Sequence, residues 1–314
     1  MKVVSVNLSE TKGVAKHPVS VATVNSVGIS GDAHSGIWHR QISLLAEESM
    51  ARLGEKAGRV FQPGEFAENI TTSGIDLEQV CLRDRLRIGA VELEVTQIGK
   101  KCHGDGCAIF KEVGSCIMPK QGLFARVLQG GEIRPGDTME HSPGHLRVRI
   151  ITLSDRASRG DYTDRSGPAI DGALRRHFAA SRWRIDVTSR LLPDDAEELR
   201  RELEACMADK MDLVFTTGGT GIGPRDITPD TVRPMLDKEI PGIMEFIRMK
   251  YGQTLPSALL SRSIAGVMGT TLVYTLPGSV KAVEEYLAEI LPTLDHSLTM
   301  LWGIDSHSRK RKYH

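Results

Sequence analysis

The chain has 314 residues, and its 40 lysines and arginines balance 40 aspartates and glutamates, so the formal net charge is zero. That length accommodates about two domains, and zero charge provides no general field to recruit nucleic acid or an anionic membrane. The start of the chain soon becomes polar, no apolar run reaches membrane-spanning length, and the five cysteines are an odd number. We therefore expect a cytoplasmic protein with reduced thiols. The basic residues 307–314 are expected to form a short solvated tail.

The first part of the chain, residues 1–142, reads as β structure. It contains short β-branched runs broken by glycines, and in residues 91–98 apolar and polar side chains alternate, which is typical of a half-buried strand. Only residues 46–58 have a helical pattern. Many short strands separated by turns predict a mostly-β barrel domain.

The pattern changes after the polar, Pro- and Gly-containing stretch at residues 140–147, which suits a linker. Apolar runs at 148–154, 211–217 and 272–276, with a further strand near 183–190, alternate with helical patterns after each of them. This alternation predicts, for residues 146–306, a doubly wound, mostly parallel α/β sheet with helices on both faces. Ligands of such folds bind outside the carboxyl ends of the strands.

Four loops at that predicted edge contain polar or glycine residues that suit a phosphate site. They contribute Ser154 and Asp155; Asp194; Thr217, Gly218, Gly219, Thr220, Gly221, Arg225 and Asp226; and Gly278, Ser279 and Lys281. Glycine N–H groups and helix N-termini favour phosphate, and carboxylates beside phosphates favour Mg²⁺. The constellation predicts phosphoryl or nucleotidyl transfer.

The glycine loop is neither a Walker loop nor a dinucleotide fingerprint. Pro224 follows Gly223 where a Walker loop has lysine, and the same Pro224 stands where the dinucleotide motif needs its last glycine. The bound phosphate is therefore expected to be of another kind.

Each of these residues also has a purely structural interpretation. Asp194 has Glu197 three positions later, as in an N-cap with a capping box. Asp226 could satisfy a turn, and Thr228, before Pro229, could be the N-cap of its helix. Gly278 could be an ordinary loop residue after Pro277.

The stretches SDRASRGDYTDRSGPAI, LLPDD, TTGGTGIGPRDITPD and LPGSVKA resemble, in this order, the motifs of the molybdopterin adenylyltransferase family. The resemblance covers residues 146–306. It implies a homotrimeric α/β domain that transfers AMP from Mg-ATP to the terminal phosphate of molybdopterin and releases pyrophosphate. It also implies functional aspartates at Asp194 and Asp226, which would hold Mg²⁺, and a molybdopterin-binding role for the glycine loop.

The stretches GDAHSGIWHRQISLLAEE, PGEFAENITTSGIDL, LRIGAVELEVTQIGKKCH and GGEIRPGD resemble the MOSC domain over about residues 1–140. The resemblance implies a β-barrel in which Cys102 carries sulfur or contacts molybdenum. Lys100 and Lys101, if close, would lower the pKa of that thiol. The alternative is a half-buried structural cysteine.

A zinc site built from Cys102, His103, Cys107 and Cys116 is the less favoured interpretation, because their spacing is not a standard zinc pattern. His34 and His39 are expected to be hydrogen-bonded loop or barrel residues, and Arg40 is a candidate contact for a pterin phosphate. The chain has no room for a pyridoxal-phosphate domain, so sulfur would come from a separate donor protein.

Two functions are compatible with these motifs. The first is an enzyme of molybdenum cofactor biosynthesis that adenylylates molybdopterin, with a MOSC domain that binds, sulfurates or delivers the product to a molybdoenzyme. The second is a non-catalytic carrier of molybdopterin or molybdenum cofactor. The pair Asp194 and Asp226 favours the enzyme, since binding an anionic pterin gains nothing from two carboxylates.

Overall fold

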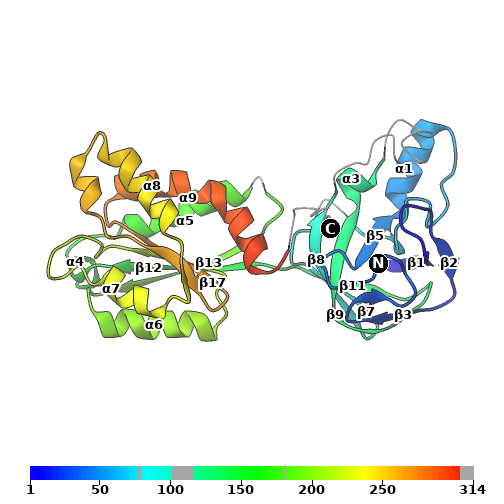
Figure 1. Cartoon of the computed structure of the whole chain (residues 1–314), viewed down its shortest axis with the longest axis horizontal. Coiled ribbons are helices and arrows are strands. Elements are labelled where there is room, and N and C mark those ends of the chain that lie inside the picture. Colours follow the sequence, from blue (N-terminus) through cyan, green and yellow to red (C-terminus); the bar gives the residue numbers. More distant parts are fainter. Residues whose placement is uncertain (77–78, 101–115, 180, 305–314) are drawn as a thin grey trace, which may run out of the picture. The chain divides into compact units, whose positions relative to one another are not determined.

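The computed structural model describes residues 1–76, 79–100, 116–179 and 181–304. The chain divides into two compact units, Met1–Gly144 and His145–Gly303 (Figure 1). None of the described helices is both long and apolar enough to cross a membrane.

The first unit is built on an eight-stranded sheet whose strands lie in the order β11-β7-β8-β9-β5-β6-β1-β2. Neighbours are antiparallel except β5 and β6. The strands are β1 (Lys2–Leu8), β2 (His17–Val19), β5 (Ile42–Ala46), β6 (Ile70–Ser73), β7 (Arg85–Ile88), β8 (Val91–Ile98), β9 (Leu123–Gln129) and β11 (Met139–Ser142). A second, three-stranded sheet comprises β3 (Ala22–Asn25), β4 (Gly28–Ile29) and β10 (Gly131–Ile133).

The large sheet closes on itself. Lys2 of β1 forms a bridge with Thr138, and the Val3 N–H donates to the Asp137 carbonyl at 2.9 Å, immediately before β11. Strands from opposite ends of the order therefore meet, which confirms the predicted mostly-β barrel. Closure satisfies backbone groups that an open edge would expose.

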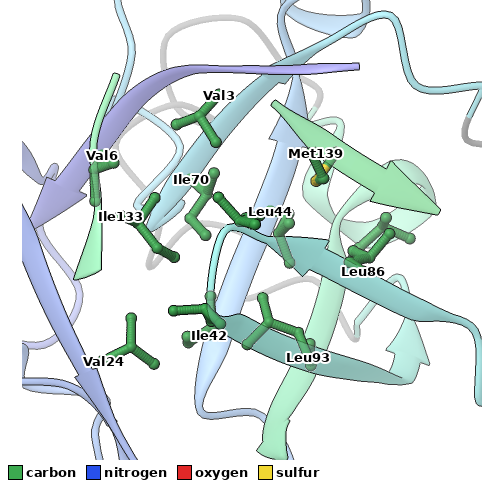
Figure 2. Close-up of a cluster of buried hydrophobic side chains, with 14 of the residues drawn as sticks. Val3, Val6, Val24, Ile42, Leu44, Ile70, Leu86, Leu93, Ile133 and Met139 are labelled. Carbon is green, nitrogen blue, oxygen red and sulfur yellow. The ribbon is translucent and has the colours of Figure 1, made fainter. Parts of the chain in front are cut away.

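Figure 2 shows the barrel core, in which side chains from opposite walls meet. Its labelled members include Val3, Val6, Ile42, Leu44, Ile70, Leu86, Leu93 and Met139, all at most 1% exposed. The predicted helix is present as α1 (Glu47–Ala57), and its Met50 and Leu53 pack in a second apolar cluster with Phe61 and Phe66. A short helix, α3 (Met118–Gln121), was not expected.

The second unit contains a six-stranded sheet in the order β13-β12-β14-β17-β16-β15. The first four strands are parallel, as predicted, while β16 and β15 are antiparallel. The strands are β12 (Leu146–Leu153), β13 (Ile185–Leu192), β14 (Leu213–Thr217), β15 (Lys238–Glu239), β16 (Ala265–Met268) and β17 (Thr271–Leu276). Thr152 pairs with Thr217, and Thr217 pairs with Leu276. The carboxyl ends of three strands are therefore level, so the loops that follow them begin together.

Helices cover both faces of this sheet, with α5, α8 and α9 on one side and α6 and α7 on the other (Figure 1). Leu199 and Leu203 of α6 pack against Ile151 and Val214 of the sheet. The helices are α4 (Asp155–Ser158), α5 (Ser166–Ala179), α6 (Ala196–Ala208), α7 (Thr228–Val232), α8 (Pro241–Gly252) and α9 (Val280–Leu301), with 3-10 turns η2 (Arg233–Met235) and η3 (Pro256–Leu260).

Three details of the second unit go beyond the sequence interpretation. Helix α5 begins at Ser166, where Asp164 accepts hydrogen bonds from the N–H groups of Ser166 and Gly167. Helix α7 has only five residues before a 3-10 turn. The sequence interpretation left residues 236–268 unassigned, and they form α8, η3, β15 and β16.

Candidate functional site

An open cavity of about 920 Å³ lies at the carboxyl edge of the parallel strands. The loops after β12, β13, β14 and β17 form one side, and α8, η3 and α9 form the other. The predicted residues that line it are Ser154, Asp155, Asp194, Gly218, Gly219, Thr220, Gly221, Arg225, Asp226, Gly278 and Ser279. Within the described part of the chain, Thr217 and Lys281 do not line it.

The glycine loop begins with a backbone that only glycine fits. Gly218 has φ +104° and Gly219 has φ +63°. A Cβ on Gly218 would lie 2.3 Å from the Leu153 carbonyl oxygen, and one on Gly219 would lie 2.6 Å from Thr228 Oγ1. A side chain at either position would therefore strain the backbone and would also collide with Leu153 or Thr228.

Thr228 supports this loop instead of capping a helix. Its hydroxyl donates to the Gly218 carbonyl at 2.8 Å, and its N–H donates to the Gly219 carbonyl at 3.0 Å. The interpretation of Thr228 as an N-cap is wrong, since α7 begins at Thr228 itself and Ile227 precedes it without a side-chain cap.

Asp194 is not a helix cap either. The N-cap of α6 is the next residue, Asp195, whose Oδ1 accepts from the N–H groups of Glu197 and Glu198 at 2.9 Å. Asp194 and Asp155 instead cap each other's backbone. The Asp155 N–H donates to Asp194 Oδ2 at 3.1 Å, and the Asp194 N–H donates to Asp155 Oδ1 at 2.9 Å. These two bonds join the loops after β12 and β13.

Three carboxylates and one guanidinium meet at this end of the cavity. Burial and the nearby carboxylate of Asp226 raise the pKa of Asp194, whose side chain is 17% exposed. Arg225 contacts the Asp155 carboxylate, and its Nη2 lies 3.8 Å from Asp194 Oδ2. The excess negative charge would stabilise a cation.

Asp226 combines the two roles considered for it. Its Oδ2 accepts from the Gly223 N–H at 2.7 Å, which holds the turn, and the residue also lines the cavity. A Cβ on Gly221 would lie 2.7 Å from that same oxygen. The described residues contain no group of three or more His, Cys, Asp or Glu side chains arranged for a metal ion. Asp194 and Asp226 would therefore hold a cation only together with oxygen atoms from a ligand.

Ser154 and Ser279 each cap a helix at the cavity. Ser154 Oγ accepts from the Ala157 N–H at 3.2 Å at the start of α4, and Ser279 Oγ accepts from the Ala282 N–H at 3.3 Å at the start of α9. A Cβ on Gly278 would lie 3.4 Å from Gly218 Cα, so these loops are in close contact. The long helix α9 therefore presents its positive end to the cavity.

The structure places the other two predicted residues outside the cavity wall. Thr217 is buried, and its hydroxyl donates to the Pro277 carbonyl at 2.8 Å, which ties β14 to the loop after β17. The Lys281 side chain is 81% exposed, and its Nζ lies 3.8 Å from Glu285 Oε1.

The opposite wall was missed by the sequence interpretation. It contains Ile247 and Tyr251 from α8, Leu255 and Leu260 near η3, and Tyr286 from α9. The signal that could have found α8 is Pro241, a good first helical residue, followed by an apolar segment. This wall is mostly apolar and aromatic, which suits a flat ring, whereas the glycine loops suit phosphate.

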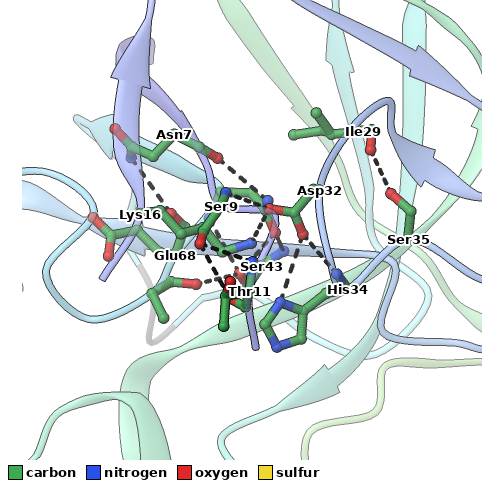
Figure 3. A network of polar contacts seen from close by, with 12 residues as sticks. Asn7, Ser9, Thr11, Lys16, Ile29, Asp32, His34, Ser35, Ser43 and Glu68 are labelled. Atoms are coloured by element: carbon green, nitrogen blue, oxygen red, sulfur yellow. Dashed lines mark hydrogen bonds and ion pairs between the residues drawn. The ribbon is translucent and has the colours of Figure 1, made fainter. Parts of the chain in front are cut away.

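The first unit contains a buried polar network around Asp32 and Glu68 (Figure 3). Lys16 Nζ lies 2.5 Å from Asp32 Oδ2, and Asp32 Oδ1 accepts from the His34 N–H at 2.9 Å. Burial lowers the pKa of Lys16; hydrogen bonds from His34 and Lys16 outweigh burial and lower the pKa of Asp32. Glu68 accepts from the Gly64 N–H at 2.6 Å, and burial raises its pKa. The hydrogen bond from His34 comes from its main chain, whereas its ring Nδ1 lies 3.5 Å from Asp32 Oδ1.

The Arg40 guanidinium lies near two aromatic rings of the same unit. Its guanidinium carbon is 4.9 Å from the Trp38 ring centroid and 5.9 Å from that of Phe124, and Lys100 Nζ is also 5.9 Å from Phe124. Burial lowers the pKa of Arg40, and in the described part of the chain its Nε is buried without a hydrogen bond. Such a donor would be satisfied by an anion.

The predictions for Cys102, and for a zinc site with His103 and Cys107, lie outside the described residues, as does Lys101. Cys116 is described and packs beside the apolar cluster of α1. His39 is buried at 6% exposure.

Comparison with known proteins identifies both units. Residues 149–296 match the model described as "Probable molybdopterin binding domain", and residues 31–140 match the MOSC domain. The molybdopterin adenylyltransferase of Helicobacter pylori J99 is 33% identical over 159 residues, which are 50% of this chain and 89% of the relative. Gephyrin of Dictyostelium discoideum is 37% identical over 160 residues, which are 49% of this chain but only 22% of gephyrin.

A crystal structure of the molybdopterin biosynthesis enzyme MoaB from Thermus thermophilus has 38% sequence identity and a TM-score of 0.45, covering 50% of this chain and 97% of that one. The family assignment depends on the sequence matches, above all on the adenylyltransferase that the chain covers almost throughout. Through residues 149–296 the chain belongs to the family of molybdopterin-binding domains that includes the molybdopterin adenylyltransferases, and it also carries a MOSC domain at residues 31–140.

Proposed function

We propose that the second unit adenylylates molybdopterin with Mg-ATP, as a step of molybdenum cofactor biosynthesis. The observation that carries this proposal is that Asp194 and Asp226 line the same cavity as the glycine loop. A site that only bound an anionic pterin would be weakened by two carboxylates, whereas a site for a metal-bound nucleotide uses them.

The residues present fit these ligands. Gly218, Gly219 and Gly221 pack so closely against Leu153, Thr228 and Asp226 that a Cβ would collide with them, and this tight backbone suits a loop whose amides bind phosphate. A cavity of about 920 Å³ has the size of a ligand site, and its apolar wall would take a ring. Asp194 and Asp226 would hold Mg²⁺ together with substrate phosphates, and the ion, when bound, would supply charge neutralisation.

The reaction needs little proton chemistry from the protein. A phosphate oxygen of molybdopterin, already anionic, attacks the α-phosphorus of ATP; a new P–O bond forms, the bond to the bridging β-phosphate oxygen breaks, and pyrophosphate leaves. The glycine-loop amides and the N-terminus of α9 bind phosphate, and Arg225 offsets negative charge. No general base is required, so most of the catalysis comes from positioning and electrostatics. We leave Lys281 out of this scheme, because its side chain is 81% exposed.

Replacement of the two aspartates tests the assignment of the site. We expect Asp226→Asn and Asp194→Asn each to slow pyrophosphate release from ATP and molybdopterin by about 100-fold or more, the range for losing a preorganised electrostatic group. Asp171→Asn on α5 is the matched control, because Asp171 pairs with Arg175 of the same helix and is not among the described residues that line the cavity. An unchanged rate in Asp226→Asn would remove that residue from the mechanism.

For the first unit we propose that it binds, sulfurates or delivers the cofactor through Cys102, with sulfur from a separate donor protein. The buried, unbonded Nε of Arg40 supports an anion contact there. Loss of molybdenum or sulfur retention in Cys102→Ala is the expected result, and retention equal to that of the wild type would demote the cysteine to a structural role.

We also propose a homotrimer assembled through the second unit. Three large apolar side chains of α8 and η3 that do not line the cavity are at least half exposed, as expected for a surface that contacts another subunit: Phe246, Met249 and Leu259. Light scattering on the purified chain would give three chain masses, and a monomer at micromolar concentration would contradict this assembly.

A further inference from the structure

Arg262 lies in the short connection between η3 and β16, outside the set of described residues that line the cavity. Its main chain and side chain nevertheless reach the glycine loop at three carbonyl groups. Its N–H donates to the Thr220 carbonyl at 2.9 Å, its Nε to the Gly221 carbonyl at 2.7 Å, and its Nη2 to the Asp226 carbonyl at 2.6 Å. One residue thus holds both ends of the loop that contains the predicted phosphate and metal groups.

The remaining arm of the guanidinium extends the contact to the next helix. Nη1 of Arg262 lies 2.9 Å from both carboxylate oxygens of Asp230 in α7. Asp230 is largely exposed, so this ion pair alone contributes little stability. Its effect is to orient the planar guanidinium, whose fixed donor directions then face the two loop carbonyls.

These bonds also fix which way the loop amides point. In a trans peptide the carbonyl and the following N–H lie on opposite sides. Because the Thr220 and Gly221 carbonyls accept from Arg262, the N–H groups of Gly221 and Ile222 are directed away from it, and both of these residues line the cavity. Arg262 therefore sets up a pair of donors of the kind that binds phosphate.

The connection that carries Arg262 is itself tied to the opposite wall. The Tyr286 hydroxyl of α9 donates to Ser261 Oγ at 2.8 Å, and Arg248 Nη1 of α8 donates to the Ser263 carbonyl at 3.1 Å. The spacing between the two walls consequently depends on residues 261–263.

We propose that Arg262 is a positioning residue of the adenylyl-transfer site: it holds the glycine loop amides and Asp226 in place relative to the apolar wall without touching the substrate. The inference rests on the proposed function for its kinetic consequence, while its structural consequence can be measured independently.

The test uses the full chain and the variants Arg262→Ala and Arg262→Lys. Arg233→Ala is the control, since Arg233 forms an exposed pair with Glu239 and is not among the described residues that line the cavity. Hydrogen exchange in peptides covering residues 218–227 should accelerate by about tenfold or more in Arg262→Ala, while exchange in β12 and β14 stays unchanged. Binding of inorganic pyrophosphate, measured by calorimetry, should weaken in parallel.

In the kinetic arm, kcat of Arg262→Ala should fall about 100-fold, as expected for a displacement of roughly 1 Å in the site. Millimolar guanidinium should restore part of that loss and leave Arg233→Ala unchanged, and Arg262→Lys should lie between the wild type and Arg262→Ala. If exchange in the loop and pyrophosphate binding match those of the wild type, the positioning role is refuted. If the wild type itself transfers no AMP, the proposed function fails, and the exchange and binding measurements still decide the role of Arg262. Should Arg262→Ala not fold, Arg262→Lys provides the same comparisons.

Discussion

Replacement of Gly219 with alanine separates the shape of the glycine loop from the general cost of a left-handed backbone. Gly269, in the turn between β16 and β17, has φ +60°, nearly the +63° of Gly219. A Cβ on Gly269 would meet nothing within 4 Å, whereas one on Gly219 would lie 2.6 Å from Thr228 Oγ1. The two alanine variants therefore have the same backbone strain, and only Gly219→Ala also has a collision with Thr228.

The size of the difference follows from what the methyl group displaces. The strain common to both variants is about 1–2 kcal/mol. In Gly219→Ala the Thr228 hydroxyl must move, which threatens its 2.8 Å hydrogen bond to the Gly218 carbonyl, a contribution of roughly 0.5–1.5 kcal/mol. Crowding in a well-packed position adds about 1–3 kcal/mol. We expect Gly219→Ala to be less stable than Gly269→Ala by about 2–4 kcal/mol.

Urea unfolding followed by tryptophan fluorescence measures this difference, because the rings of Trp183 and Trp302 lie 5.4 Å apart, tilted by 55°, within the second unit. The same preparations should show weakened binding of ATP or molybdopterin in Gly219→Ala and unchanged binding in Gly269→Ala. Equal destabilisation and equal binding in the two variants would refute the claim that the contact with Thr228 shapes the loop.

Other substitutions test the electrostatics. The pKa of Asp194 is raised, so its stabilising contribution is present at low pH and is lost as pH rises through the folded-state pKa. Asp194→Asn should therefore raise the thermal unfolding midpoint at pH 7 by roughly 1–3 °C, and the gain should vanish below about pH 4; a gain that persisted in acid would contradict the cause given. Lys281→Ala should leave kcat within about twofold, because the ammonium is solvated, and a large loss would restore Lys281 to the site. Lys16→Met should cost about 3–5 kcal/mol in urea unfolding by leaving Asp32 buried without its cation, and a change below about 1 kcal/mol would mean that water replaces the ammonium.

The placement of the glycine loop, Asp155 and Asp194 at one edge could be predicted, because parallel strands bring their carboxyl ends together and the alternation of strands and helices is visible in the sequence. Finer roles could not. Asp194 and Asp195 are adjacent and chemically identical, and only the phase of α6 decides which one caps it. Thr217 and Lys281 lie in or beside loops that line the cavity, but the Thr217 hydroxyl bonds to the Pro277 carbonyl and the Lys281 side chain is exposed to solvent.

The apolar wall and Arg262 were beyond the sequence interpretation for a different reason. Helix α8 and η3 interrupt the alternation of strand and helix, so this alternation does not predict them. Arg262 donates hydrogen bonds to carbonyl groups 36 to 42 residues earlier in the chain. Every residue has a backbone carbonyl, so the residue types do not reveal which carbonyls accept these bonds. Contacts of this kind become visible only when the fold brings the segments together.

The most direct test of the central claim is a multiple-turnover reaction of the purified chain with Mg-ATP and excess molybdopterin, with adenylylated molybdopterin and pyrophosphate quantified together. We expect equal amounts of the two products, many per chain, and almost none with Asp226→Asn. Tight molybdopterin binding by a folded chain, with no more than one product per chain, would contradict it and favour a carrier.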